Sequence, residues 1–197
     1  MRYHAKLETL LGELTVIRDE EALAGLYFRG HWPRPDRSAF GLRAQEGFED
    51  IGRQLGEYLA GDRSVFELPV EVEGTEFDRQ VWELVSRVPY GQTTTYGELA
   101  RALGSGTDPR DVGAAVGRNP LCIVIPCHRV IGSTGKLTGY AGGLNRKRTL
   151  LGIEHTAPRR RCPSMTLGHR CSHISTNDPR SCFHQRWGQR RAAAGHW

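Results

Sequence analysis

Cysteine is scarce in the first 156 residues of this chain of 197, which hold only Cys122 and Cys127. The total of five cysteines is odd, which is typical of reduced thiols rather than of a disulfide framework. No apolar run reaches the length that a bilayer requires, and residues 1–8 lack the apolar core of a signal peptide. We therefore expect an intracellular protein, cytoplasmic or, in a eukaryote, nuclear, with no membrane partner.

The first 156 residues also lack a large net charge. Eight arginines and a single acid, Asp178, follow residue 156, so the rest of the chain carries 19 basic and 21 acidic side chains. Because this part is close to neutral, any binding of nucleic acid by it has to come from a local patch of charge.

The basic segment 157–197 lacks apolar periodicity. Its Cys171-Ser172-His173 and Cys182-Phe183-His184 invite interpretation as a zinc or nucleic-acid site, but their spacing matches no common zinc pattern. The composition favours a disordered tail that adds at most nonspecific affinity for phosphate. We expect no bound metal.

Residues 1–72 have the pattern of a small α/β domain. Residues 14–17 and 24–28 are predicted strands joined through an acidic turn, and residues 65–72 alternate as a last strand does. Between them, apolar side chains from Phe48 to Leu59 recur at helical spacing. This predicts a sheet with one helix, a support domain in which we find no chemistry.

Residues 73–156 change to short helices. The first contains residues 77–88, and the second starts from a cap at Thr94 or Thr95. The third starts at Asp108, which is followed by a proline at the first helical position. Two short helices around a glycine-containing turn predict a mainly helical domain of the winged-helix or helix-turn-helix type.

The third of these helices has almost no side-chain bulk over residues 112–117, which include two glycines. Glycine inside a helix costs about 1 kcal/mol relative to alanine. Two interpretations are equally open: a surface flat enough for a large object to approach the backbone, or a helix that packs tightly against its neighbour.

The most informative residues are Pro126-Cys127-His128-Arg129. They follow the apolar run 121–125, which reads as a buried strand that ends at a proline. The imidazole and guanidinium beside Cys127 favour its thiolate, the nucleophilic form of cysteine. Cys127 is therefore the candidate reaction centre. Cys122, an odd number of residues earlier, would face the opposite side of a strand, as a core residue does.

The order and spacing of five segments between residues 75 and 154 resemble the O6-alkylguanine-DNA alkyltransferases, also called methylated-DNA–protein-cysteine methyltransferases. The matching segments are residues 88–91, 95–100, 110–120, 125–131 and 139–143. The resemblance implies direct reversal of DNA damage: O6-alkylguanine is flipped out of duplex DNA and its alkyl group passes irreversibly to the protein, once per molecule and without a cofactor. The implied partner is double-stranded DNA, bound by a monomer, with or without cooperativity.

The resemblance also implies the residues that do this chemistry. Cys127 accepts the alkyl group, His128 acts as a base through a water, and Glu154 orients His128. Asn119 bridges the turn near the active-site strand. Tyr96 donates a proton or a hydrogen bond to the guanine ring.

A second set of residues is implied to hold DNA. Arg110 takes the place of the flipped nucleotide, and the flat helix face of Gly113, Ala114 and Ala115 lies in a groove. Tyr140 and Ala141 close over the base, Ala141 through its backbone N–H. The carbonyls of Cys127 and Val130 read the exocyclic amine. Family members often have serine where Ala141 stands, so a hydroxyl contact is absent.

Two other function classes fit parts of the sequence. A DNA-binding regulator could use Cys127 as an alkylation sensor, although residues 112–117 offer almost nothing with which to read bases. A thiol hydrolase could use Cys127 with His128, although neighbouring residues on an extended segment point to opposite faces.

Overall fold

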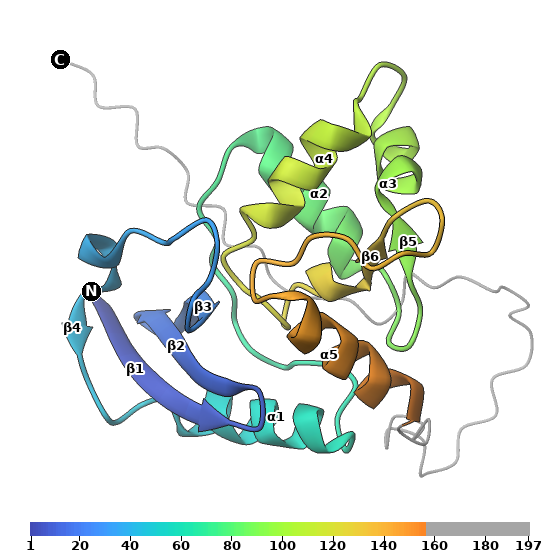
Figure 1. The fold of residues 1–197 in the computed structure, drawn as a ribbon. Helices are drawn as coiled ribbons and strands as arrows, with labels where there is room; N and C mark the ends of the chain where they lie inside the picture. Colours follow the sequence, from blue (N-terminus) through green and yellow to red (C-terminus); the bar gives the residue numbers. More distant parts are fainter. Residues whose placement is uncertain (157–197) are drawn as a thin grey trace, which may run out of the picture.

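The computed structural model describes residues 1–156. Its first half contains a four-stranded sheet in the order β3-β2-β1-β4 (Figure 1). Strands β1 (Arg2–Thr9), β2 (Gly12–Asp19) and β3 (Ala22–Phe28) are antiparallel neighbours, and the short β4 (Leu42–Arg43) pairs parallel to β1. Two of the three strands predicted in this half lie in β2 and β3, whereas β1 and β4 were not predicted.

Helix α1 (Glu49–Ala60) confirms the predicted helix and lies beside the sheet (Figure 1). It ends at Gly61, whose left-handed φ of 80° suits glycine. Its buried side chains, Ile51, Leu55, Tyr58 and Leu59, join one hydrophobic core with the inner face of the sheet. A 3-10 turn, η1 (Arg37–Phe40), lies between β3 and β4.

The prediction of a strand over residues 65–72 is wrong, but the alternation of buried and exposed side chains that suggested it is present. Phe66, Leu68, Val70 and Val72 are buried, yet this segment makes only an isolated bridge, from Val70 to Leu23. The period-two pattern therefore reports which side chains face the core, while ladder formation also requires a free strand edge along the whole segment.

The second half consists mainly of helices: α2 (Glu76–Ser86), α3 (Tyr96–Leu103), α4 (Pro109–Gly117) and α5 (Leu144–Thr156). Thr95 caps α3 in a capping box with Glu98, and Asp108 caps α4 with Pro109 at the first helical position. The predicted starts of both helices are thus confirmed. Two residue pairs, β5 (Thr94–Thr95) and β6 (Val130–Ile131), form a small parallel sheet.

The edge of β3 joins the two halves. The Leu26 backbone donates to Pro120 O at 2.8 Å, and Cys122 N donates back to Leu26 O at 3.2 Å. The segment that leads to the candidate cysteine is therefore anchored on the sheet of the first half. Within residues 1–156, no helix is both long and apolar enough to span a membrane.

Candidate active site

The segment before Cys127 is a buried turn, so the prediction of a strand over residues 121–125 is wrong. Ile123 has a left-handed φ of 74°, and Ile125 N donates to Leu121 O at 2.8 Å. The side chain of Asn119 bridges this turn, because its amide donates to Ile125 O and its oxygen accepts from Leu121 N, both at 2.9 Å. A short apolar run does not distinguish a buried strand from a buried turn.

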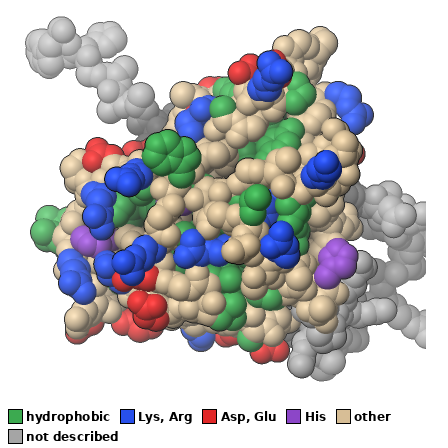
Figure 2. All heavy atoms as spheres, in the orientation of Figure 1, with side chains coloured by type: hydrophobic (Ala, Val, Ile, Leu, Met, Phe, Trp, Pro, Cys, Tyr) green, Lys and Arg blue, Asp and Glu red, His purple; other side chains and the backbone are tan. Residues whose placement is uncertain are grey.

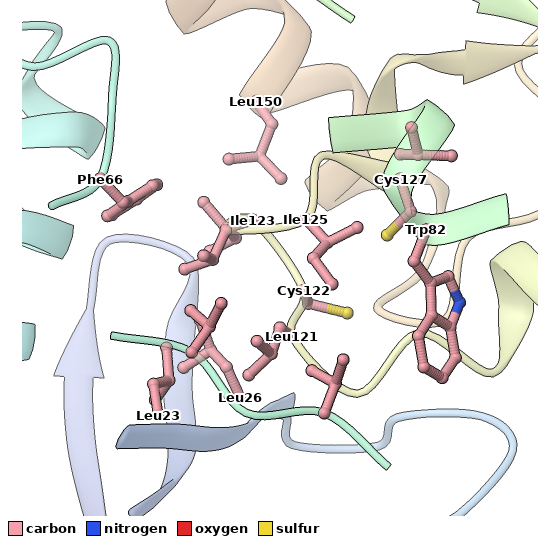
Figure 3. Close-up of a cluster of buried hydrophobic side chains, with 14 of the residues drawn as sticks. Leu23, Leu26, Phe66, Trp82, Leu121, Cys122, Ile123, Ile125, Cys127 and Leu150 are labelled. Carbon is pink, nitrogen blue, oxygen red and sulfur yellow. The ribbon is translucent and has the colours of Figure 1, made fainter. Parts of the chain in front are cut away.

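The turn brings the two thiols together (Figure 3). Cys127 lies in the 3-10 turn η2 (Cys127–Arg129), and its side chain is 4% exposed. A hydrogen bond from Cys122 lowers the pKa of the Cys127 thiol, and Asn119 and the positive charge of Lys147 act in the same direction. Cys122 is a core residue, as predicted, but the prediction that it faces away from Cys127 is wrong because the chain reverses between them.

Behind Cys127, the next residue, His128, forms a buried hydrogen bond with Glu154 of α5. Nε2 of His128 lies 2.6 Å from Oε1 of Glu154, and both side chains are fully enclosed. Burial would raise the pKa of Glu154, but the hydrogen bond from His128 and the charge of Arg129 lower it to about 2. The carboxylate is therefore ionised at every pH at which the protein is expected to work.

This geometry determines how His128 can act. Burial lowers the pKa of His128, so the ring is neutral near pH 7. With Nε2 facing a carboxylate, the ring proton belongs on Nε2, and Nδ1 is left as an acceptor. Nδ1 is buried and has no hydrogen-bond partner among the described residues. The neutral ring of His128 is thus able to accept a proton at Nδ1.

Three residues complete this network in roles that sequence reasoning missed; Arg129 was expected to act on the thiol of Cys127. Arg129 binds both oxygens of Glu154 at 3.0 to 3.1 Å. The hydroxyl of Tyr58, on α1, hydrogen-bonds to Glu154 and lies 3.3 Å from Nε2 of His128. Tyr58 reads in the sequence as one apolar position of a helical stripe, and nothing local distinguishes it from its neighbours.

The third missed residue is Lys147, a fully buried lysine on α5. Its ammonium group donates to Val130 O at 2.6 Å, Thr138 O at 2.8 Å and Gly139 O at 3.1 Å. Burial lowers its pKa to about 8. Lys147 therefore holds the loop of residues 138–139 against the site, and one lone pair of the Val130 carbonyl is already in use.

Aromatic side chains surround the mouth of the site. The hydroxyl of Tyr96 donates to Thr138 O at 3.5 Å, and burial raises its pKa, so it keeps its proton. Tyr140 packs edge-on against His128 and Phe28, and its buried hydroxyl lies by the thiol of Cys122, whose pKa its hydrogen bond acts to lower. Ala141, half-buried, accepts from Trp32 N at 3.0 Å through its carbonyl.

Helix α4 presents only part of its small-residue face. Arg110 and Ala114 are exposed and Gly113 is half-buried, but Ala115 is fully buried and its carbonyl accepts from the indole of Trp82 at 2.8 Å. The assignment of Ala115 to a DNA-facing surface is therefore corrected: every third or fourth position of a helix faces its core, and Ala115 is such a position.

The described residues contain no group of three or more His, Cys, Asp or Glu side chains that could hold a metal ion. The cysteines and histidines of the tail, together with the expectation of a disordered tail, lie outside the described residues. The site thus contains one cysteine with a lowered pKa, Cys127, next to a buried histidine and carboxylate. This arrangement is typical of proteins that transfer a group to or through a thiol.

Comparison with known proteins places this chemistry in a family. Residues 2–72 match the ribonuclease-like domain of 6-O-methylguanine DNA methyltransferase, and residues 76–156 match the DNA binding domain of the same family. The chain belongs to the 6-O-methylguanine DNA methyltransferase family.

Individual relatives agree with this assignment. A methylated-DNA–protein-cysteine methyltransferase of Mycolicibacterium paratuberculosis is 41% identical over 82% of this chain and 95% of its own length. One from Methanosarcina acetivorans is 41% identical over 77% and 97%. The crystal structure of the Mycobacterium tuberculosis O6-methylguanine methyltransferase superimposes with a TM-score of 0.74 at 37% identity, over 81% of this chain and 97% of that one. The OGT of that organism in complex with DNA gives 0.73 at 37% identity, over 80% and 96%.

Proposed function

We propose that this protein repairs DNA by direct reversal: it flips O6-alkylguanine out of the duplex and transfers the alkyl group to Cys127 in a single turnover. The observation that carries the proposal is the placement of Cys127, whose pKa is lowered, directly before the buried His128–Glu154 pair. The partner is double-stranded DNA, and no cofactor takes part. Residues 73–156 do the chemistry and residues 1–72 support them.

The thiol is activated by loss of its proton. Nδ1 of His128 accepts that proton through a bridging water, and the resulting imidazolium is stabilised by Glu154. The Cys127 thiolate then attacks the alkyl carbon, a C–S bond forms, and the C–O6 bond breaks with its electron pair left on guanine. The thioether product has no easy route back, so each molecule acts once.

The departing guanine gains negative charge, which has to be neutralised. Tyr96 supplies a proton to the guanine ring nitrogen. The raised pKa of Tyr96 then favours recovery of a proton from solvent. The Ala141 N–H binds O6, while Tyr140 closes over the base. The carbonyls of Cys127 and Val130 accept from the exocyclic amine, that of Val130 through the lone pair that Lys147 does not use.

Helices α3 and α4 act as a helix-turn-helix of winged-helix type, with α4 in a groove of the duplex. Two glycines of α4 support a docking role. No atom lies within 4 Å of a Cβ built at Gly117, and at Gly113 only the Tyr96 ring does, at 3.7 Å, an ordinary contact. Internal packing therefore requires neither glycine, and close approach of a nucleic-acid backbone explains both. Arg110, exposed at the start of α4, fills the gap left by the flipped base.

The competing functions are less well supported. A regulator would read bases from α4, whose exposed side chains near its middle are small. In a thiol hydrolase, the cysteine and histidine would hydrogen-bond directly, but Nε2 of His128 is committed to Glu154 and Nδ1 has no partner among residues 1–156.

The test is transfer of label from a duplex that holds one radiolabelled O6-methylguanine. We expect one methyl group per protein molecule, and none for Cys127→Ser. Transfer that persists in this variant would show that another residue is the acceptor. No transfer by the folded, DNA-binding wild-type protein would leave a regulatory or damage-recognition module, and repeated turnover of an ester substrate would favour the hydrolase.

A further inference from the structure

Three arginines around the loop between β3 and η1 have no partner for their charge. Arg29, Arg34 and Arg37 are exposed, and their side chains make no ion pair or hydrogen bond within residues 1–156. Of the other arginines in residues 1–72, Arg2, Arg18, Arg53 and Arg63 pair with carboxylates, and only Arg43, on β4, is also without an ion pair within residues 1–156. Because this part of the chain is close to neutral overall, the three unpaired guanidinium groups form a local positive patch.

The same loop exposes a large aromatic side chain. The indole of Trp32 is 72% exposed, whereas the other tryptophan in the described residues, Trp82, is buried at 2%. Its backbone N–H donates to Ala141 O at 3.0 Å, which ties it to the loop proposed to cover the flipped base. An exposed indole among arginines is the combination that nucleic-acid strands bind, through base stacking and phosphate contacts.

A cleft of about 400 Å³ lies beside this loop. Tyr27, Phe28 and Phe40 form part of its wall, and the three arginines line it. Burial lowers the pKa of His31, also in the lining, to about 4, so His31 is neutral and the arginines supply the positive charge. The single acid of the lining, Glu13, is already paired with Lys6 at 3.0 Å.

Figure 2 shows the wider setting of this patch. Lys and Arg side chains gather, with hydrophobic side chains among them, over the part of the surface where β1, β3 and η1 lie in Figure 1. The patch therefore lies on the half of the molecule that has no part in the proposed helix-turn-helix, and it reaches the site through the contact between Trp32 and Ala141.

We infer that the N-terminal half carries a second DNA-binding surface, made by Arg29, Trp32, Arg34 and Arg37, which holds the strand next to the flipped nucleotide. This inference rests on the proposed function. The arginines bind backbone phosphates, and Trp32 stacks on a base or sugar that base flipping exposes. The duplex is thereby held on both sides of the mouth, by α4 on one side and by this loop on the other.

The arginines are tested by the salt dependence of binding. Affinity of the full chain for a duplex with one O6-methylguanine is measured by fluorescence anisotropy across a range of salt concentrations. Each phosphate contact contributes about 0.9 to the slope of log K against log salt, so R29Q/R34Q/R37Q should lower the slope by about 2 to 3. The control R53Q/R79Q/R87Q removes the same charge from arginines that are ion-paired on their own helices and should leave the slope nearly unchanged. Equal slopes for the two triple variants would overturn the inference.

Trp32 is tested separately. Trp32→Ala should weaken binding at every salt concentration by about fivefold or more while the slope stays constant, because stacking releases no counterions. Leu10→Ala, which truncates another exposed apolar side chain, is the control and should bind like wild type. If Trp32→Ala binds the duplex with wild-type affinity, the indole is not part of the DNA-binding surface.

The two proposals fail in distinguishable ways. If wild-type protein binds the duplex but transfers no methyl group, the repair function fails. If it transfers the group and the R29Q/R34Q/R37Q variant keeps the wild-type slope, only the second surface fails.

Discussion

The hydroxyl of Tyr58 and the carboxylate of Glu154 are hydrogen-bonded although 96 residues separate them in the chain. Tyr58 belongs to α1 in the N-terminal half, and Glu154 to α5 in the other half. Oε1 of Glu154 accepts from Tyr58, His128 and Arg129, so the N-terminal half helps to orient His128, the base that we propose for Cys127. It is therefore more than a passive support.

Removing this hydroxyl tests its role. Tyr58→Phe keeps the ring, which stacks on Phe66, but loses a hydrogen bond to a charged group, worth about 1.5 to 3 kcal/mol of unfolding free energy. We expect a corresponding loss of stability, slower single-turnover methyl transfer, and a shifted pH–rate profile. Tyr3→Phe is the matched control, since its hydroxyl contacts only the exposed sulfur of Met1. Equal transfer rates and pH profiles in both variants would show that Tyr58 does not position the base.

The carboxylate of Glu154 predicts an acid-dependent loss of stability. Its pKa in the folded protein is about 2, against 4.5 for an unperturbed glutamate, so it stabilises the fold above pH 4.5 and this stabilisation is lost as the pH falls from 4.5 toward 2. The difference corresponds to on the order of 3 kcal/mol.

Urea unfolding at several pH values measures this dependence. Glu154→Gln should flatten the acid limb and destabilise the protein at pH 7, because Arg129 and His128 lose their charged partner. If Glu154→Gln loses unfolding free energy between pH 4.5 and 2 as the wild type does, another carboxylate causes this loss.

The contact between the two thiols predicts that Cys122 lowers the pKa of Cys127. Besides Cys122, the groups that face the Cys127 thiol are Asn119, Lys147, Tyr96 and Tyr140. Cys122→Ala removes the hydrogen bond that contributes most to lowering the pKa of Cys127, so that pKa should rise. Methyl transfer should then slow at pH 6.5 and recover at higher pH.

Iodoacetamide alkylation against pH measures the pKa of Cys127 directly. Cys122→Ser keeps a hydrogen-bond donor at the same position and should restore most of the lowering of the Cys127 pKa. If Cys122→Ala acted only through lost packing, the serine variant would not restore this pKa. An unchanged pKa of Cys127 in the alanine variant would contradict the prediction.

Replacing Gly113 by alanine should increase the stability of the protein and weaken its binding to DNA. A Cβ there makes only an ordinary contact with Tyr96, so Gly113→Ala should stabilise α4 by about 0.5 to 1 kcal/mol. If the DNA backbone approaches this face, the methyl group should weaken binding. Gly152→Ala in α5, where no atom lies within 4 Å of a built Cβ, should stabilise similarly and leave binding unchanged. Thermal unfolding and anisotropy measure the two effects.

Local signals predicted α1 to α4 well because they act within a few residues, whereas α5 was not predicted. The capping box of Thr95 with Glu98, Asp108 before Pro109, and Gly61 after α1 all specify helix ends through contacts with neighbouring backbone. The strand predictions were less reliable. Residues 65–72 and 121–125 have the apolar pattern of strands, but whether a segment pairs depends on the edges that the rest of the fold offers.

By itself, the sequence determined the reactive tetrapeptide around Cys127, the two capped helices that precede it and the neutrality of the first 156 residues. These are properties of adjacent residues or of composition, so no fold is needed to read them. Only the tertiary structure decided which distant groups meet Cys127 and His128. Tyr58, Lys147 and Cys122 enter the site because the β3 edge, the turn bridged by Asn119 and α5 converge there. Such contacts depend on burial and chain reversal, which no periodicity encodes.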